Sequence, residues 1–580
     1  MKNIVPIATQ KILLRYLLLT SLLLCPILSS AKTVYQLKGL SDELTVNVDA
    51  HIKGLPEDDF NTSKQFQARL AEAVRSALQA DGYYEPIINI TIDSSGRHAV
   101  GTINVSAGKP VRYQEIDIVF DSFALDDPNF KKVLKGAPKK GDILNHKKYD
   151  NIKKQLQRIA SKKGYFDAKF IKKRLEVAPS RHMAFLKLEF HSGHRYNFGP
   201  VTFTGSQIEQ DRLSSLTPFN EGDPYLSTKL GEFNQSLSGS SWFSSIVVSG
   251  DTDNMAGYEL PIDVQLAPSK RNKVEVGIGY STDVQTRLKL NWDKPWINAQ
   301  GHSLHSAFSL SKPEQLAEFS YKIPLEDVLK DYYQFQLGFK GVDNLDTDSQ
   351  EYTFGFERDW IFDNDWHRTA FLRISYEDYI QADEEDETLL LMPGLTYTRT
   401  QLQKKPMPDW GNKQQMTLEL SDPTWGSDTR FARVQLGTAW IQGNNNNRGL
   451  FRLDAGAVFI DDITNAPPSI RFFVGGDNSI RGYRYESIAP KDSDDQLIGG
   501  QYQTTSSLEY QRRIMGKWWG ALFFDIGSAW TDAPIWYKGT GVGVRWASPV
   551  GPVRIDLAWG LDAPKDDAQY QIHFSLGPEL

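Results

Sequence analysis

The sequence predicts an α+β N-terminal region followed by an all-β, sixteen-stranded antiparallel transmembrane barrel. Three observations lead to this prediction. Apolar residues recur at helical spacing in the first part of the chain, and they alternate with polar residues at period two after about residue 269. Thirteen of the fourteen tryptophans also lie in the second part. With 580 residues the chain is too long for one compact core, so several domains are expected.

The overall composition argues against two broad classes of protein. The net charge is −7, which does not favour an extended nucleic-acid surface, so no nucleic-acid partner is expected. The mean hydropathy is −0.43, which does not suit a bundle of membrane helices.

The only long apolar run is at the N-terminus, where it follows basic residues and ends in small ones ahead of Lys32. Residues 1–31 are therefore predicted to be a secretory signal peptide. Cys25, the only cysteine, follows Leu24 rather than a small residue, so lipidation is not expected. The mature chain would have no cysteine, hence no disulfide and no cysteine metal site. We expect no metal and no cofactor.

Residues 32–268 contain a unit that recurs three times. In each unit a helical pattern ends near a glycine, and an aromatic pair and a short strand follow. The pairs begin at Tyr83, Tyr165 and Trp242, which are 82 and 77 residues apart. This spacing indicates a small domain that is repeated, rather than a solenoid turn. We predict three α+β modules of two helices on a small sheet, at residues 32–107, 108–192 and 193–268.

Residues 269–580 alternate along nearly every segment. In Gly520–Trp530, for example, Leu522 and Phe524 share one face, whereas Asp525 and Gly527 share the other. Sixteen such segments can be counted, starting near Val274, Leu288, Leu304, Ala317, Tyr333, Tyr352, Thr369, Leu389, Gln415, Ala432, Leu450, Thr505, Ala521, Gly541, Val553 and Tyr570.

A soluble sandwich also alternates, so alternation alone does not identify a membrane barrel. The concentration of tryptophan in this part is typical of lipid interfaces. The last strand, "YQIHFSLG", places Tyr570, Ile572 and Phe574 on one face, which fits the C-terminal strand of an outer-membrane barrel. Together these features favour a barrel in lipid.

The longest strand connection, from about Asp461 to Gln501, contains "GGDNSIRGYRYES". The simpler interpretation is a solvated loop whose glycines make turns. Alternatively, the loop folds back into the lumen, where Arg481 would need acidic partners. Inward positions of the next two strands offer Glu509 and Asp525. Gly482 and Gly527 would leave room for close approach.

At these residues the sequence resembles the Omp85 superfamily. The loop looks like the superfamily's lid-loop motif, Val/Ile-Arg-Gly-Phe/Tyr, and "FFDIG" looks like its partner strand motif, Phe-Asp-x-Gly. Three repeats, no plug helix and the ending "GPEL" are most similar to the TamA branch, the outer-membrane subunits of translocation and assembly modules. Five repeats would point to BamA, and two repeats after a plug helix to a two-partner secretion transporter. The residues matched to the lid-loop motif are Gly475, Gly476, Ser479, Ile480, Arg481, Gly482 and Tyr483.

The resemblance implies a location in the outer membrane, in contact with its lipid, with the repeats in the periplasm. It implies that the chain helps outer-membrane proteins such as autotransporters to insert or to be secreted, so its substrates would be unfolded outer-membrane proteins. It also implies a TamB-like partner, anchored in the inner membrane, that acts through the repeats.

Closing the barrel requires the first strand, about Lys273–Ser281, to pair with the last, about Gln569–Gly577. Gly277 and Gly279 face inward in the first strand, and glycine weakens a strand. We therefore expect this seam to be the easiest place to open, and an open edge would template an incoming strand. An equally good interpretation is that the two glycines relieve crowding in the lumen.

Enzyme and porin interpretations have less support. The sequence has no G-x-S-x-G, H-E-x-x-H or P-loop motif, so no catalytic residues are expected. A passive porin would need neither the repeats nor the arginine loop. The acidic run Glu377–Glu387 is predicted to be an extracellular loop, solvated rather than ion-binding.

Overall fold

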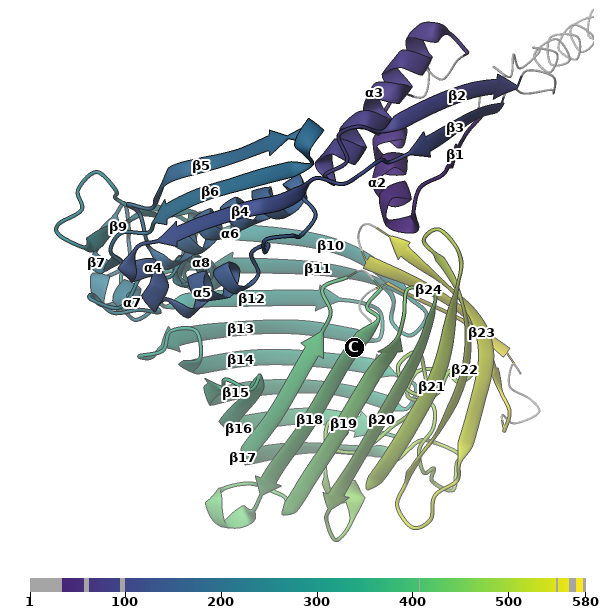
Figure 1. Ribbon diagram of the computed structural model, residues 1–580. Helices are drawn as coiled ribbons and strands as arrows, with labels where there is room; N and C mark the ends of the chain where they lie inside the picture. The colour runs from purple at the N-terminus through teal and green to yellow at the C-terminus, as the bar shows by residue number, and fades with distance from the viewer. Residues whose placement is uncertain are drawn as a thin grey trace, which may run out of the picture. The chain divides into compact units, whose positions relative to one another are not determined.

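The computed structural model describes residues 34–56, 62–93, 100–405, 407–548, 551–562 and 570–576. The predicted signal peptide lies outside these residues. The chain forms two compact units (Figure 1). Of the described residues, the first unit comprises those up to Phe198, Gly222–Thr228 and Ala256–Glu259, and the second comprises the others.

The first unit begins with a three-stranded sheet of order β1-β3-β2, in which β1 is parallel and β2 antiparallel to β3. Two helices pack against it, and Ser63 caps the second by accepting a hydrogen bond from the Phe66 N–H at 3.2 Å. The fully buried Leu70 and Leu78 of this helix pack with Ile103 of the sheet. The elements are β1 (Val34–Lys38), α2 (Asp42–Lys53), α3 (Lys64–Ala80), β2 (Ile87–Asp93) and β3 (Val100–Ser106).

The second sheet repeats this plan with the order β4-β6-β5. Its longest helix, α6, ends at Gly164, whose φ of +80° is the left-handed conformation that glycine adopts at a helix end. Leu156 of α6 is buried against Leu186 of the sheet. The elements are β4 (Arg112–Phe120), α4 (Ser122–Asp126), α5 (Pro128–Lys135), α6 (His146–Lys163), β5 (Lys169–Ala178) and β6 (Met183–His191).

The third sheet, of order β7-β9-β8, leads directly into the barrel. Within the second unit this module is fixed to two barrel turns. The Trp242 indole N–H donates to the Gly301 carbonyl at 3.1 Å, and Arg212 donates to the Leu325 carbonyl at 2.7 Å. The elements are β7 (Asn197–Thr204), α7 (Gln210–Ser214), α8 (Ser227–Gly239), β8 (Phe243–Gly250) and β9 (Glu259–Pro268).

Sixteen antiparallel strands, each paired with the next in sequence, form the barrel sheet (Figure 1). The predicted fold class is confirmed. The strands are β10 (Lys273–Ser281), β11 (Gln285–Lys294), β12 (Ser303–Leu310), β13 (Glu314–Pro324), β14 (Asp331–Asn344), β15 (Thr347–Ile361), β16 (Trp366–Gln381), β17 (Glu384–Leu402), β18 (Trp410–Ser421), β19 (Phe431–Gly443), β20 (Asn447–Phe459), β21 (Tyr502–Met515), β22 (Trp518–Trp530), β23 (Tyr537–Ser548), β24 (Gly551–Gly560) and β25 (Tyr570–Leu576).

The strands present an apolar outer face and a mixed inner face, as the alternation predicts. On β22, Leu522 and Phe524 are exposed on the outside, whereas Phe523 and Asp525 are buried inside. Within the described ranges, no helix combines the length and apolar character needed to span a bilayer.

The prediction of a loop at Glu377–Glu387 is wrong. The run forms a strand, a two-residue turn at 382–383 and the start of the next strand. Residues 377–381 alternate: Glu377 and Tyr379 are buried inside, and Ile380 is exposed, whereas residues 383–387 are all exposed. Ser469 donates to the Glu377 carboxylate at 2.5 Å. The many charges suggested a solvated loop, and residues 383–387 are exposed, but the alternation of residues 377–381 places that part of the run in a strand.

Candidate functional site

The connection between β20 and β21, residues 460–501, folds on itself; we call it the lid loop. Backbone bridges join Phe472 to Gly500 and Val474 to Ile488. These apolar side chains and Ile480 are buried in a shared core with inward-facing barrel residues. The loop is therefore not the solvated alternative. Its glycines make turns, but they do so inside a packed structure.

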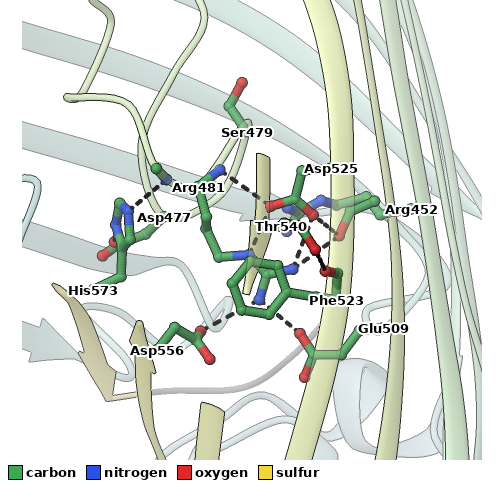
Figure 2. Close-up of polar contacts among 12 residues, drawn as sticks. Arg452, Asp477, Ser479, Arg481, Glu509, Phe523, Asp525, Thr540, Asp556 and His573 are labelled. Carbon is green, nitrogen blue, oxygen red and sulfur yellow. Dashed lines mark hydrogen bonds and ion pairs between the residues drawn. The ribbon is translucent and has the colours of Figure 1, made fainter. Parts of the chain in front are cut away.

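Arg481 lies at the centre of a buried charge cluster (Figure 2). Its Nε and Nη2 donate to the two carboxylate oxygens of Asp525 at 2.7 and 2.9 Å. Its Nη1 donates to Glu509 at 2.7 Å. The guanidinium also lies 3.5 Å from the ring centroid of Phe523. The structure thus brings Arg481 together with Glu509 and Asp525, the two acids that the alternation of the strands places on the lumen face.

Two further members of the cluster were missed by the sequence reasoning. Asp556 on β24 accepts from Arg481 at 3.3 Å. Arg545 on β23 donates to Asp556 at 2.6 Å and to Glu509 at 2.8 Å. Both occupy inward positions of the strands that follow β22, so the same parity argument carried two strands further would have found them.

The short distances and the burial of its members identify the cluster as a network of ion pairs that holds the structure together. Arg481 is 4 % exposed, Asp525 0 % and Arg545 0 %. A buried arginine without carboxylates would be strongly unfavourable, and each carboxylate would be so without its arginine. The bidentate pairing to Asp525 satisfies this requirement, and it fixes the position of the loop more tightly than a point charge would.

Two glycines permit this close approach. At Gly482, φ is +96°, and a Cβ would lie 2.7 Å from the Trp559 carbonyl carbon. At Gly527 a Cβ would lie 2.8 Å from the Thr504 carbonyl oxygen and 2.9 Å from the Ile480 side chain. Both positions therefore exclude a side chain, as the sequence predicts.

The rest of the motif shapes and anchors the loop. Gly475 and Gly476 adopt φ values of +118° and +98°, and the Gly475 N–H donates to the Ser479 hydroxyl at 3.1 Å. The Tyr483 hydroxyl donates to the Lys538 carbonyl at 3.1 Å on β23. The loop is thus held to the barrel wall at several points.

At the seam the structure departs from the prediction. Among the described residues, β10 and β25 form no ladder, and the hydrogen bonds across the seam join β25 to Thr282, the residue that follows β10. Phe574 donates its N–H to the Thr282 hydroxyl at 2.7 Å, and that hydroxyl donates to the Ile572 carbonyl at 3.2 Å. Gln569 and Gly577 lie outside the described residues.

The strands at the seam are exposed. Outside, Tyr570 and Ile572 are exposed, and the rings of Tyr280 and Phe574 lie 6.0 Å apart. Inside, a Cβ at Gly279 would meet nothing within 4 Å, and one at Gly277 would make only ordinary contact. Crowding in the lumen therefore does not explain these two glycines.

Comparison with known proteins decides the family. Residues 270–579 match the model of the Omp85 superfamily domain. The chain belongs to the Omp85 superfamily. Residues 34–107 also match a POTRA domain model described as TamA domain 1. The chain is therefore an outer-membrane barrel protein with periplasmic POTRA-type modules.

Relatives with assigned names support this family. The Omp85 chain is 24 % identical over 507 residues to the outer membrane protein assembly factor BamA of Nitratidesulfovibrio vulgaris, covering 80 % of this chain and 62 % of the relative. It is 21 % identical over 299 residues to BamA of Buchnera aphidicola, covering 49 % of this chain and 47 % of the relative. The chain thus spans about half to 62 % of the length of these relatives.

A solved structure shares the fold. The crystal structure of BamA from Haemophilus ducreyi lacking POTRA domains 1–3 superposes with a TM-score of 0.68 at 16 % identity, covering 80 % of this chain and 99 % of that one. At this identity the likeness shows the fold of the Omp85 chain and nothing finer.

Proposed function

We propose that this Omp85 protein is the outer-membrane subunit of a translocation and assembly module. It would help outer-membrane proteins such as autotransporters to insert or to be secreted, through lateral opening of the seam. One observation carries the proposal: the ends of the sixteen-stranded sheet are joined, among the described residues, through Thr282 rather than by a ladder.

The physical basis is the edge of β10, which forms no ladder with another strand on this side among the described residues. A strand edge presents backbone N–H and C=O groups that must find partners, because lipid offers none. An unfolded substrate strand can supply them by pairing with β10. Gly277 and Gly279 lower the cost of rearranging this strand, since glycine contributes no side-chain packing. A seam with few bonds thus supports strand addition.

The N-terminal modules support a role for a second protein. Each has a three-stranded sheet with edge strands, a common site for adding a partner strand. The match of residues 34–107 to TamA domain 1 favours a TamB-like, inner-membrane-anchored protein as that partner. We propose that it meets the first module, which is the farthest along the chain from the barrel.

The test is reconstitution into liposomes. Full-length protein should convert an unfolded autotransporter barrel into its heat-modifiable, protease-resistant form, whereas liposomes carrying an unrelated closed barrel should not. Equal conversion by both liposomes would contradict the proposed function.

A second arm tests the partner. Deleting residues 32–107 should leave barrel folding intact, because β10–β25 do not include them. The truncated chain should fail to recover a TamB-like protein from solubilised inner membranes. Equal recovery with the full and truncated chains would place the docking surface on another module.

The similarity to BamA favours one alternative, a general insertase. Depleting the chain from cells separates the two. Loss of a few autotransporter-like proteins supports the assembly-module role, whereas loss of most outer-membrane barrels supports the general insertase. A passive porin would instead show steady conductance with no effect on assembly.

A further inference from the structure

The lid loop has a second attachment that the Arg481 cluster does not involve. Asp477, four residues before Arg481, donates its backbone N–H to the Asp283 carboxylate at 2.8 Å. Its own carboxylate accepts from His573 Nδ1 at 2.5 Å (Figure 2). Asp477 and His573 are both buried. Asp477 therefore links two other segments of the chain.

Those two segments are the opposite sides of the seam. Asp283 lies in the turn that follows the first strand, β10, and His573 lies on the last strand, β25. One loop residue thus holds both ends of the sheet, although the ends form no ladder with each other among the described residues. Gly476 shows how tight the contact is, because a Cβ there would lie 2.7 Å from the Asp283 carboxylate.

His573 also binds the lid motif directly. Its Nε2 accepts from the Gly482 N–H at 2.9 Å. A nitrogen that accepts carries no proton, so Nδ1 must be the protonated nitrogen that donates to Asp477. Both ring nitrogens are then satisfied in the neutral form of the imidazole. The last strand is consequently fastened to the loop at Asp477 and again at Gly482.

The same hydrogen bonds argue against a metal ion. The ligand atoms of Asp283, Asp477 and His573 lie within 4.8 Å of one another, and these residue types bind metals. However, a histidine that binds a metal through Nδ1 carries its proton on Nε2 and donates it outward. Here Nε2 faces the Gly482 N–H. If His573 bound a metal through Nδ1, the proton on Nε2 would point at the Gly482 N–H, and two donors would face each other. Hydrogen bonds account for the group better.

The groups around Asp283 act on its carboxylate in opposite directions. Burial and the neighbouring Asp477 carboxylate raise the pKa of Asp283 to about 7. The charged and titratable groups that line the adjoining cavity of about 470 Å³, besides Asp283 and Asp477, are Tyr280 on β10, Arg287 and Lys289 on β11, Glu314 on β13, Tyr485 in the lid loop and Arg554 on β24. The basic side chains offset the two carboxylates of the link.

We propose that Asp477, Asp283 and His573 form a clasp by which the lid loop holds the barrel seam closed. Displacing the loop then removes one of the two links across the seam within the described residues, the other being the Thr282 hydrogen bonds. The consequence for substrate assembly rests on the proposed function, but the clasp itself does not.

The test measures the seam without a substrate. Spin labels are placed on cysteines at Val276 of β10 and Ile572 of β25, both of which are exposed on the outer face. Their distance distribution is measured by pulsed electron paramagnetic resonance in lipid nanodiscs. His573→Phe and Asp283→Ala should each enlarge the long-distance population by about tenfold, the effect of losing a charge-assisted hydrogen bond. Asp494→Ala, an exposed acid of the same loop, is the matched control and should leave the distribution unchanged.

Three outcomes overturn the clasp. The first is an unchanged distance distribution in both clasp variants, provided that each folds with the heat-modifiable mobility of the parent. The second is an equal widening in Asp494→Ala. The third is a widening of the parent by EDTA that zinc reverses, which would make the link a metal site. By contrast, variants that open the seam without altering substrate assembly would count against the proposed function and leave the clasp standing.

Discussion

The barrel wall around β16 and the seam between β10 and β25 are built from the same kind of strand but are held differently. The ladder between β15 and β16 has fifteen residue pairs, and that between β16 and β17 has sixteen. At the seam the strands span nine and seven residues, and Thr282 supplies the described hydrogen bonds. The length of the ladder therefore differs between these two regions of one sheet, and with it the number of backbone bonds that hold each strand.

The contrast shows where this barrel can open at least cost. Separating β16 from β17 would expose a long row of backbone groups to lipid, and each unsatisfied group costs several kcal/mol. Within the described residues, separating β10 from β25 breaks only the hydrogen bonds of Thr282. The lid loop then becomes the main additional restraint, because it contacts the turn after β10 and the last strand.

A covalent link should have the largest effect on this contrast. Tyr280→Cys with Phe574→Cys joins the seam at two outward rings that are in contact. Once oxidised, the linked barrel should lose at least nine-tenths of its assembly activity and regain it on reduction. The matched control is Phe354→Cys with Ile374→Cys, which are partners on β15 and β16. Full activity of a completely cross-linked seam would show that opening is not required.

Removing Arg481 should have the next largest effect. Arg481→Ala leaves Asp525, Glu509 and Asp556 without one of their cations, at a local cost of about 3–5 kcal/mol. The ladders should survive, so the barrel should insert, but limited proteolysis should cut the lid loop much faster. Arg484→Ala, an exposed arginine of the same loop, serves as control. If the lid loop of Arg481→Ala resisted the protease as well as that of the parent, the charge cluster would not be what anchors the loop.

A small change in the first strand should give the smallest effect. Gly279→Ala adds a methyl group where nothing lies within 4 Å. It should therefore stabilise β10 by about 0.5–1 kcal/mol, because alanine loses less conformational entropy than glycine when the strand forms. Amide hydrogen exchange along β10 should slow by a few-fold. Gly355→Ala on β15, where a Cβ would make ordinary contact, should change exchange in its long ladder very little. If the two substitutions slow exchange equally, the first strand is not a weak element.

How much of a feature could be predicted depends on how far apart in the sequence its residues lie. The strands follow from alternation, a local property, and Glu509 and Asp525 follow from parity on the two strands after the loop. Asp283 and His573 are 290 residues apart in sequence, and nothing local to either indicates that Asp477 joins them. The expected pairing of the seam assumed complete closure, which alternation cannot test because an unpaired edge strand alternates equally well.

The third module is attached to the barrel on one side of the seam. Trp242, Arg212 and Glu209 contact the turns before β12 and β14, and these strands lie on the β10 side of the seam. A load applied to this module would therefore enter the barrel on the β10 side and reach the last strand around the circumference, through the Thr282 hydrogen bonds or through the lid loop. A displacement of the third module would thus act first on the β10 side of the seam, before the β25 side.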